Sequence, residues 1–230
     1  MRDSEYVEVL PDGALALAAV DDDAADALLE EARRRARELG LGTLEFRPSP
    51  GDLVHQRLLV RHDFRLRDEV LALRRQLHEP EPAPVWPEGV GVRPFVAADA
   101  PAVHALLDEA YGGWDTAYVP LAHEEWKRSM MGDPEFDPTV WWLAERDGAP
   151  VGCSLWWSSG WLKDVAVREG ERGHGVGTAL VRHGLAEFAR RGLGHVGLKV
   201  DGRNPTGAQR LYERLGFVVE RRDQVWALSL

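Results

Sequence analysis

A short glycine-rich stretch, Arg172 to Thr178, constrains the chain more than any other segment. From Gly173 to Gly177 every second residue is glycine, so few side chains cover the backbone N–H groups. The pattern predicts an apolar strand before it (Trp161 to Val167) and an amphipathic helix after it (Val176 to about Arg191). The first N–H groups of a helix are unpaired and carry the positive end of its dipole. The stretch therefore predicts an anion site suited to a phosphate or pyrophosphate.

Two better-known phosphate loops fit this stretch poorly. A P-loop requires a lysine after its last glycine, and none follows Gly177. A dinucleotide fingerprint requires the spacing Gly-x-Gly-x-x-Gly, which differs from the alternate glycines here, although Asp201 supplies an acidic residue downstream. A tight strand-to-helix turn without a ligand is a third alternative.

Two motifs carry a family resemblance. The segment Val165-Ala166-Val167-x4-Arg172-Gly-x-Gly-Val-Gly is similar to the coenzyme A pyrophosphate loop of the GNAT superfamily of N-acetyltransferases. Downstream, Asn204-Pro-Thr-Gly-Ala-Gln-Arg-Leu-Tyr-Glu-Arg-Leu-Gly-Phe217 resembles the closing helix of that superfamily, with its Asn, Tyr and Gly-Phe ending. The resemblance covers residues 89–230 and implies an α+β fold with a mixed sheet.

The resemblance also implies a reaction: direct transfer of an acetyl group from acetyl-CoA to a primary amine of a small molecule, without a metal. Val165 to Val167 would hold the pantetheine arm, and the Val165 N–H would stabilise the oxyanion. Arg172 to Thr178 would bind the pyrophosphate, and Asn204 would hydrogen-bond the coenzyme. The implied coenzyme-binding residues are Val165, Ala166, Val167, Arg172, Gly173, His174, Gly175, Val176, Gly177, Thr178 and Asn204.

Tyr212 and Asp164 are the candidate catalytic residues. A phenol can donate a proton to a leaving thiolate, which gives Tyr212 the role of acid. Related enzymes often carry a glutamate on the strand before the loop, but the matching positions here are Trp161 and Lys163. Asp164 is adjacent, on the opposite face of the strand, and we expect it to be the base. Other candidates are a base acting through water and the carboxylates of Asp115, Glu124 and Glu125.

All nine tryptophans lie from Trp86 onward. The pairs Trp141-Trp142 and Trp156-Trp157 would place one ring on each face of a strand, as core packing requires. A second interpretation is an aromatic wall around the acceptor, for which the candidates are Trp114, Trp126 and Trp161.

The N-terminal part repeats the C-terminal half of the second domain. Gly40-Leu41-Gly42 matches Gly192-Leu193-Gly194, and Arg61-His-Asp-Phe64 matches Arg214-Leu-Gly-Phe217. Each copy is expected to end in a two-strand hairpin, at 64–73 and before Leu230. The alignment puts Asp21 to Asp23 opposite Gly173 to Gly175, and Leu59 opposite Tyr212. The first copy is therefore predicted to lack both the anion site and the hydroxyl.

These observations predict a tandem arrangement. Residues 1–78 are interpreted as a degenerate partial GNAT-like lobe, residues 79–88 as a proline-rich linker, and residues 89–230 as the catalytic GNAT domain. This order, the linker and Asp133-Pro-x-Phe-Asp-Pro138 resemble the mycothiol synthase family of GNAT enzymes, in which the first domain is inactive and the second catalytic.

Composition limits the partners. A net charge of −10 disfavours nucleic acid, and no apolar run reaches membrane-spanning length. The single cysteine, Cys153, excludes a disulfide framework and is expected to be a buried core residue. No Cys/His cluster has metal-ligand spacing, and the absence of a signal pattern predicts a cytoplasmic location. An acetyltransferase for protein N-termini or lysines, and an acyl-CoA-binding module without activity, remain alternatives.

Overall fold

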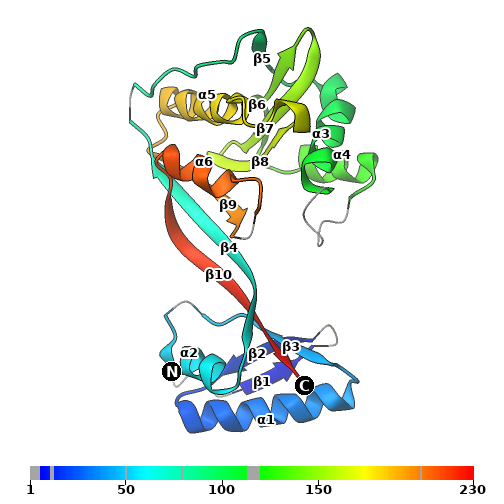
Figure 1. The fold of residues 1–230 in the computed structure, drawn as a ribbon, viewed down its shortest axis with the longest axis vertical. Helices are drawn as coiled ribbons and strands as arrows, with labels where there is room; N and C mark the ends of the chain where they lie inside the picture. Colours follow the sequence, from blue (N-terminus) through cyan, green and yellow to red (C-terminus); the bar gives the residue numbers. More distant parts are fainter. Residues whose placement is uncertain (1–5, 11–12, 50, 79, 113–119, 203) are drawn as a thin grey trace. The chain divides into compact units, whose positions relative to one another are not determined.

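The computed structural model describes residues 6–10, 13–49, 51–78, 80–112, 120–202 and 204–230. The chain forms two compact units: unit 1 comprises Met1–Leu71, Asp201–Arg203 and Arg221–Leu230, and unit 2 comprises Ala72–Val200 and Asn204–Glu220. Two long strands, β4 (Arg65–Gln76) and β10 (Val218–Ser229), contribute residues to both units (Figure 1).

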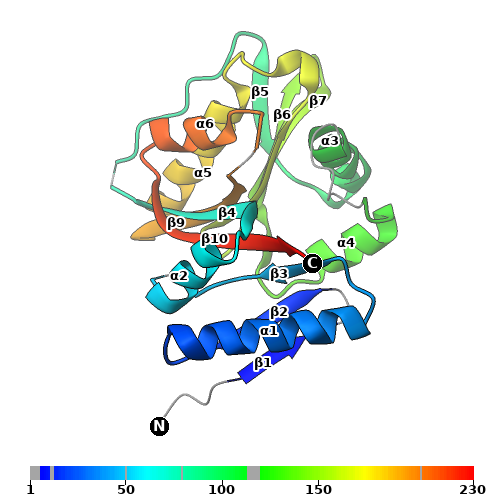
Figure 2. The same ribbon diagram turned by 60° about the horizontal axis from the view of Figure 1, so that its bottom comes forward.

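Unit 1 consists of a sheet with two helices. Its strand order is β1-β2-β3-β10-β4, with β2 and β3 parallel and the pairs β1/β2 and β3/β10 antiparallel. The α1 helix lies along this sheet (Figure 2). The elements that belong to unit 1 alone are β1 (Tyr6–Val9), β2 (Ala14–Ala18), α1 (Asp22–Glu38), β3 (Thr43–Phe46) and α2 (Leu53–Arg61).

The sequence of α1 explains both its ends and its buried face. The Asp21 side chain accepts a hydrogen bond from the Ala24 N–H at 2.9 Å and so caps the helix. Gly40, with a φ of +71°, ends it in the left-handed conformation that glycine adopts readily. The buried residues recur at helical spacing and pack into the core of unit 1; they are Ala25, Leu29, Ala32 and Ala36.

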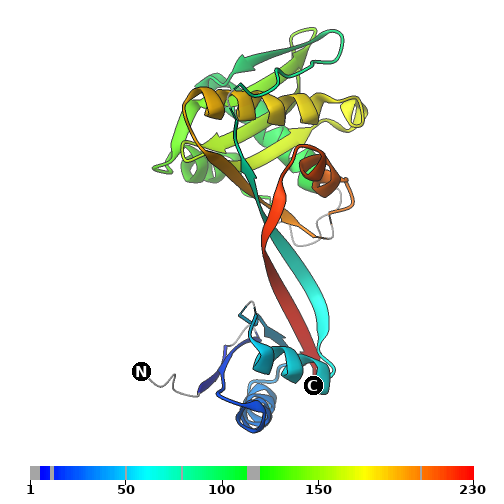
Figure 3. The same ribbon diagram turned by 90° about the vertical axis from the view of Figure 1, so that its left-hand side faces the viewer.

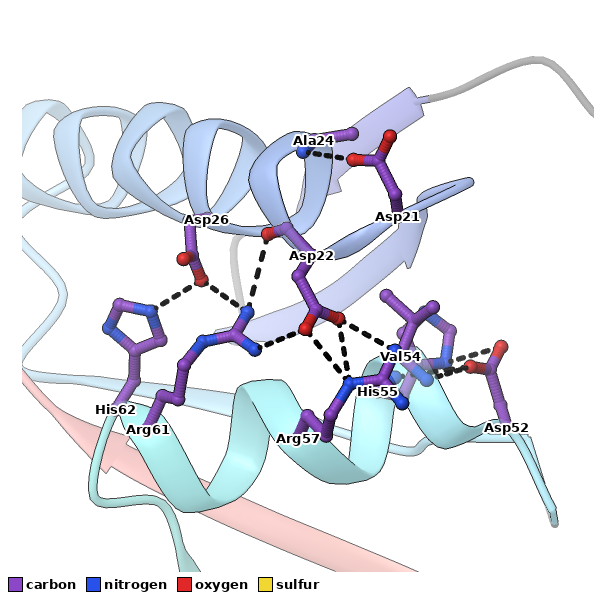
Figure 4. A network of polar contacts seen from close by, with 10 residues as sticks. All are labelled: Asp21, Asp22, Ala24, Asp26, Asp52, Val54, His55, Arg57, Arg61 and His62. Atoms are coloured by element: carbon purple, nitrogen blue, oxygen red, sulfur yellow. Dashed lines mark hydrogen bonds and ion pairs between the residues drawn. The ribbon is translucent and has the colours of Figure 1, made fainter.

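Ion pairs join the start of α1 to α2 (Figure 4). The Asp22 carboxylate lies 2.8 Å from Arg57 and 3.0 Å from Arg61. Asp26 contacts Arg61 and His62, each at 2.7 Å. The hydrogen bond from Arg57 lowers the pKa of Asp22 below its usual value. Two carboxylates in the first turns of α1, Asp22 and Asp26, are therefore paired with cations or a histidine of the chain.

Unit 2 contains the motif-bearing segments. Its strand order is β4-β9-β8-β7-β6-β5; β8 and β9 are parallel, whereas β5 to β8 pair antiparallel in sequence. Its strands are β5 (Val90–Pro94), β6 (Phe136–Arg146), β7 (Ala149–Trp157), β8 (Trp161–Val167) and β9 (His195–Asp201). Its helices are η1 (Ala97–Asp99), α3 (Ala100–Gly112), α4 (His123–Met131), η2 (Glu169–Glu171), α5 (Val176–Arg190) and α6 (Ala208–Arg214).

The sheet of unit 2 is covered on both faces. The α5 helix lies on one face, and α3 and α4 lie on the other (Figures 1 and 3). Gly184 of α5 allows the close approach, because a Cβ atom there would lie 2.5 Å from the Trp156 ring. Trp141 and Trp156 are fully buried, so the core interpretation holds for these two rings. The mixed sheet with helices confirms the predicted α+β fold class.

The predicted terminal hairpins are wrong. Each copy ends in one continuous strand, β4 or β10, instead of two strands joined by a turn. The physical reason is that neither stretch contains a glycine or proline that would favour reversal of the chain. Within the described residues, no helix is long and apolar enough to cross a membrane.

The two copies exchange their last strands. β10 ends the second copy, yet Trp226 pairs with Phe46 of β3 in unit 1. β4 ends the first copy, yet its residues from Ala72 onward belong to unit 2. The compact units therefore do not follow the boundaries 1–78, 79–88 and 89–230. Those boundaries describe copies within the sequence, and they stay a prediction.

The cap of α1 gives a test of unit 1. We expect Asp21→Ala to lower the free energy of unfolding by ~1 kcal/mol, because the Ala24 N–H loses its acceptor. Urea denaturation followed by circular dichroism measures this loss. The matched control is Asp23→Ala in the same helical turn, which removes a favourable charge but no cap and should cost about 0.3 kcal/mol. Equal losses in both variants would contradict the capping role.

Candidate active site

One edge of β8 is left without a neighbouring strand. In the described structure, β8 pairs with β9 only at Trp161 and Leu162, whereas its pairing with β7 continues to Val167. The N–H of Arg168 donates to the Val151 carbonyl of β7 at 2.9 Å. Backbone groups alternate in direction along a strand, so those of Val165 and Val167 point toward the open edge. An extended ligand with amide groups could hydrogen-bond there.

Glycines shape the loop that follows β8. Gly173 and Gly175 have φ values of +78° and +93°, in the left-handed region. Gly175 is the N-cap of α5 and offers no side chain to the first N–H groups of that helix. A Cβ atom on Gly177 would lie 3.4 Å from Val167. The turn therefore favours glycine at the first two positions, whereas at the third a Cβ atom would make only an ordinary van der Waals contact.

The other residues predicted to bind the coenzyme differ in which of their groups are exposed. Ala166 and Val176 are buried, so the exposed groups of this segment belong to the backbone and to Arg172 and His174. The Arg172 side chain donates from Nε to the Val167 carbonyl at 2.9 Å and so bridges loop and strand. Thr178 lies half-buried in the first turn of α5.

Asn204 occupies a local turn. Its side-chain oxygen accepts a hydrogen bond from the Thr206 N–H at 2.8 Å, as in an Asx turn. Asn204 does not cap α6, whose N-cap is Gly207, and a role of Asn204 toward the coenzyme stays a prediction.

The structure brings Asp164 and Tyr212 into one electrostatic cluster and adds a residue that the sequence interpretation missed. The Tyr111 hydroxyl donates to Oδ1 of Asp164 at 2.9 Å. Tyr111 is the penultimate residue of α3. No signal in the sequence pairs it with Asp164, because the bond spans 53 residues and depends on how α3 packs against β8.

Burial dominates the electrostatics of this cluster. Burial raises the pKa of Asp164, and the nearby Lys163 charge and the Tyr111 hydrogen bond act against that rise. Burial, reinforced by the Asp164 charge, also raises the pKa of Tyr212. At neutral pH Tyr212 is therefore a neutral phenol, which can donate a proton, beside a carboxyl that holds a proton more strongly than an exposed one.

The remaining candidates lie elsewhere or are core residues. Glu124 and Glu125 are exposed in the first turn of α4. Trp126 is buried against His104 and Trp141, which is core packing. Trp161 packs against Gly197 of β9, where a Cβ atom would lie 2.7 Å from its ring. Trp114 and Asp115 lie outside the described residues.

The family follows from a match over slightly more than half of the chain. The model of the acetyltransferase (GNAT) family matches residues 100–217, which include β8, the glycine loop, α5 and α6. The chain belongs to this family. Among solved structures, a GCN5-related N-acetyltransferase from Sphaerobacter thermophilus is 27% identical, with a TM-score of 0.74 over 97% of this chain and 75% of that chain. A tandem GNAT protein from the clavulanic acid biosynthesis pathway, 17% identical with a TM-score of 0.59 over 94% of this chain and 75% of that chain, supports the fold alone.

Curated relatives confirm the resemblance to the mycothiol synthase family. A mycothiol acetyltransferase of Thermobispora bispora is 40% identical over 168 residues, which are 63% of this chain and 52% of that protein. A mycothiol acetyltransferase of Thermomonospora curvata is 34% identical over 206 residues, which are 83% of this chain and 64% of that protein. The chain spans about half the length of the first curated relatives it matches.

Cys153 gives a test of burial beside the site. Burial raises the pKa of the Cys153 thiol to about 12, and the Asp164 charge adds to that rise. The reactive species is the thiolate, so we expect native protein at pH 8 to resist a thiol-specific chromogenic reagent. After denaturation the same protein should react with one equivalent. Rapid reaction of the folded protein would show that Cys153 is accessible.

Proposed function

We propose that this chain is an acetyl-CoA-dependent N-acetyltransferase that transfers an acetyl group to a primary amine of a small molecule by direct attack in a ternary complex. The observation that carries the proposal is the continuous path from the open edge of β8, through the glycine loop, to the uncapped start of α5. A polar arm followed by a pyrophosphate matches the chemistry of that path.

The residues fit the coenzyme without a change of fold. The backbone groups of Val165 and Val167 would hydrogen-bond the amides of the pantetheine arm. The loop of Gly173 to Gly177 has no Cβ atoms at its two left-handed positions, so a pyrophosphate can reach the backbone N–H groups. The Arg172 guanidinium has its Nε on the Val167 carbonyl, which places its charge beside the loop.

The chemistry requires three groups. Asp164 would accept a proton from the ammonium form of the acceptor, and the free amine then attacks the thioester carbon. The Val165 N–H would donate to the tetrahedral oxyanion, a contribution of about 3 kcal/mol in comparable sites. As the carbon–sulfur bond breaks, the Tyr212 hydroxyl would donate its proton to the departing thiolate. The acylated nitrogen would then lose its surplus proton, which restores the Tyr212 hydroxyl. The products are an N-acetyl amine and free coenzyme A.

We also propose a chemical class for the amine acceptor. Relatives that are 32–40% identical to this chain over the aligned residues bear the name mycothiol acetyltransferase. An aminosugar or a mycothiol-precursor-like amine is therefore the acceptor we propose to test first. A peptide amine belongs in the same screen, because the protein N-terminal and lysine alternatives make the same amide bond.

The first copy is proposed to be a partial lobe that binds no coenzyme. Asp21 caps its helix start, and Asp22 lies in ion pairs with Arg57 and Arg61. A pyrophosphate would meet carboxylates at that helix start, where the second copy has glycines. One coenzyme site per chain follows from this proposal.

An acetyltransferase assay with Tyr212→Phe tests the proposed reaction. We expect the unaltered protein to release coenzyme A thiol from acetyl-CoA only when an amine of the screen is present, with the acetylated amine detected by mass spectrometry. Tyr212→Phe should lower kcat by about 100-fold, because the leaving thiolate loses its proton donor. An unchanged kcat would remove the acid role, and coenzyme binding without turnover on any amine would favour the binding-module alternative.

Calorimetry with His174→Asp tests the loop. The unaltered protein should bind one acetyl-CoA per chain. His174→Asp imitates the first copy and should weaken binding about 10-fold at low salt, because the new carboxylate repels the pyrophosphate. The matched control is His195→Asp, at an exposed histidine that begins β9. Equal affinities for the two variants would place the pyrophosphate elsewhere, and two sites per chain would contradict the inactive first copy.

A further inference from the structure

The hydrogen bond between Tyr111 and Asp164 joins the helix α3 to the strand β8. Tyr111 lies at the end of α3, and Asp164 lies in the middle of β8. The hydroxyl-to-Oδ1 distance of 2.9 Å is that of an ordinary hydrogen bond. The side chain of Asp164 is only 11% exposed, so this bond is sheltered from water.

Four titratable groups face Asp164 from the elements packed around it. Tyr111 approaches from α3, Lys163 from β8 itself, Cys153 from β7, and Tyr212 from α6. Burial keeps the thiol of Cys153 and the phenol of Tyr212 neutral at physiological pH. Lys163 is the one cation among these four, and its Nζ lies 3.3 Å from Oδ2.

Of the two groups bonded to Asp164, Tyr111 is the better fixed. The side chain of Lys163 is 41% exposed, and an exposed ammonium on a flexible stem is weakly held. Tyr111 is half-buried on α3, which packs against β8, and its bond to Oδ1 is shorter. A hydrogen bond to a charged group is stronger than one between neutral groups. The Tyr111 hydrogen bond acts against burial, which raises the pKa of this carboxyl.

We propose that Tyr111 is a positioning residue for acetyl transfer: its hydroxyl holds Oδ1 of Asp164 and favours the ionised carboxylate, so that Oδ2 accepts the proton of the acceptor's ammonium group in place of its contact with the half-exposed Lys163 ammonium. The inference rests on the proposed function. In the step, an ammonium N–H bond breaks and an O–H bond forms on Oδ2, while the nitrogen keeps the electron pair with which it attacks the thioester. Asp164 later releases the proton to water.

The pH profile of Tyr111→Phe tests this role. The hydrogen bond lowers the pKa of Asp164, so its loss raises that pKa and moves the acid limb of kcat/KM to higher pH. We expect a shift of about 1 pH unit, which is a loss of up to about 10-fold on the acid side and little change on the alkaline side. The matched control is Tyr6→Phe, at a half-exposed tyrosine of unit 1, which should leave the profile unchanged.

Two further measurements separate positioning from a packing defect. In the Asp164→Asn background, Tyr111→Phe should have no additional effect on kcat/KM, because Tyr111 acts through that carboxylate. Titration of protein labelled with carboxyl-¹³C aspartate should show the Asp164 resonance, identified by its loss in Asp164→Asn, at a higher midpoint in Tyr111→Phe. Because only ionisation of Asp164 is read, this titration is informative without turnover.

The outcomes are distinguishable. A raised midpoint together with a shifted acid limb supports the inference. An unchanged midpoint overturns it, even if acetyl transfer is observed and the proposed function stands. A raised midpoint with an unmoved acid limb also overturns it, because Asp164 would then not be the group whose ionisation limits the reaction. Absence of acetyl transfer in the unaltered protein would contradict the proposed function itself, and the inference would fall with it.

Discussion

The separation of β8 from β9 after Leu162 is the constraint on which the candidate site depends. An unpaired backbone group away from water costs free energy comparable to a lost hydrogen bond. Two neighbouring strands therefore separate only where water, a side chain or a ligand can bond the backbone groups that become exposed. Here one carbonyl, that of Val167, is bonded by Arg172, and the other groups of the edge are available to a ligand.

The carboxyl of Asp164 depends on a balance that the same packing creates. The sheet, α3 and α6 exclude water from it, which favours the protonated acid, whereas Tyr111 and Lys163 favour the carboxylate. A base in an acyl transfer must be ionised before the acceptor binds and still hold a proton strongly enough to take it from an ammonium. A carboxyl with a raised pKa meets the second requirement, and the hydrogen bond from Tyr111 supports the first. The two requirements conflict, and burial alone would satisfy only one of them.

The sequence predicted the features that depend on local pattern. The strand, glycine loop and helix of the anion segment could be found because glycines at positive φ and a helical apolar stripe leave direct traces in the residue order. Tyr111 could not be assigned, because its bond to Asp164 spans 53 residues and depends on how α3 packs on β8. The exchange of β4 and β10 was missed for a related reason. Strand pairing over such separations leaves no periodic signal, although the absence of glycine and proline from both stretches favours one continuous strand over a hairpin.

The two copies show how one helix start can serve two purposes. The first N–H groups of any helix need acceptors. In α1 the chain supplies one acceptor, the Asp21 carboxylate, and the neighbouring Asp22 carboxylate is paired with two arginines. In α5 the N-cap is Gly175, which has no side chain and supplies no such acceptor. The need for an acceptor is the same at both helix starts, so an N-cap without a side chain leaves that need to water or to a bound anion, and this is where we propose the pyrophosphate binds.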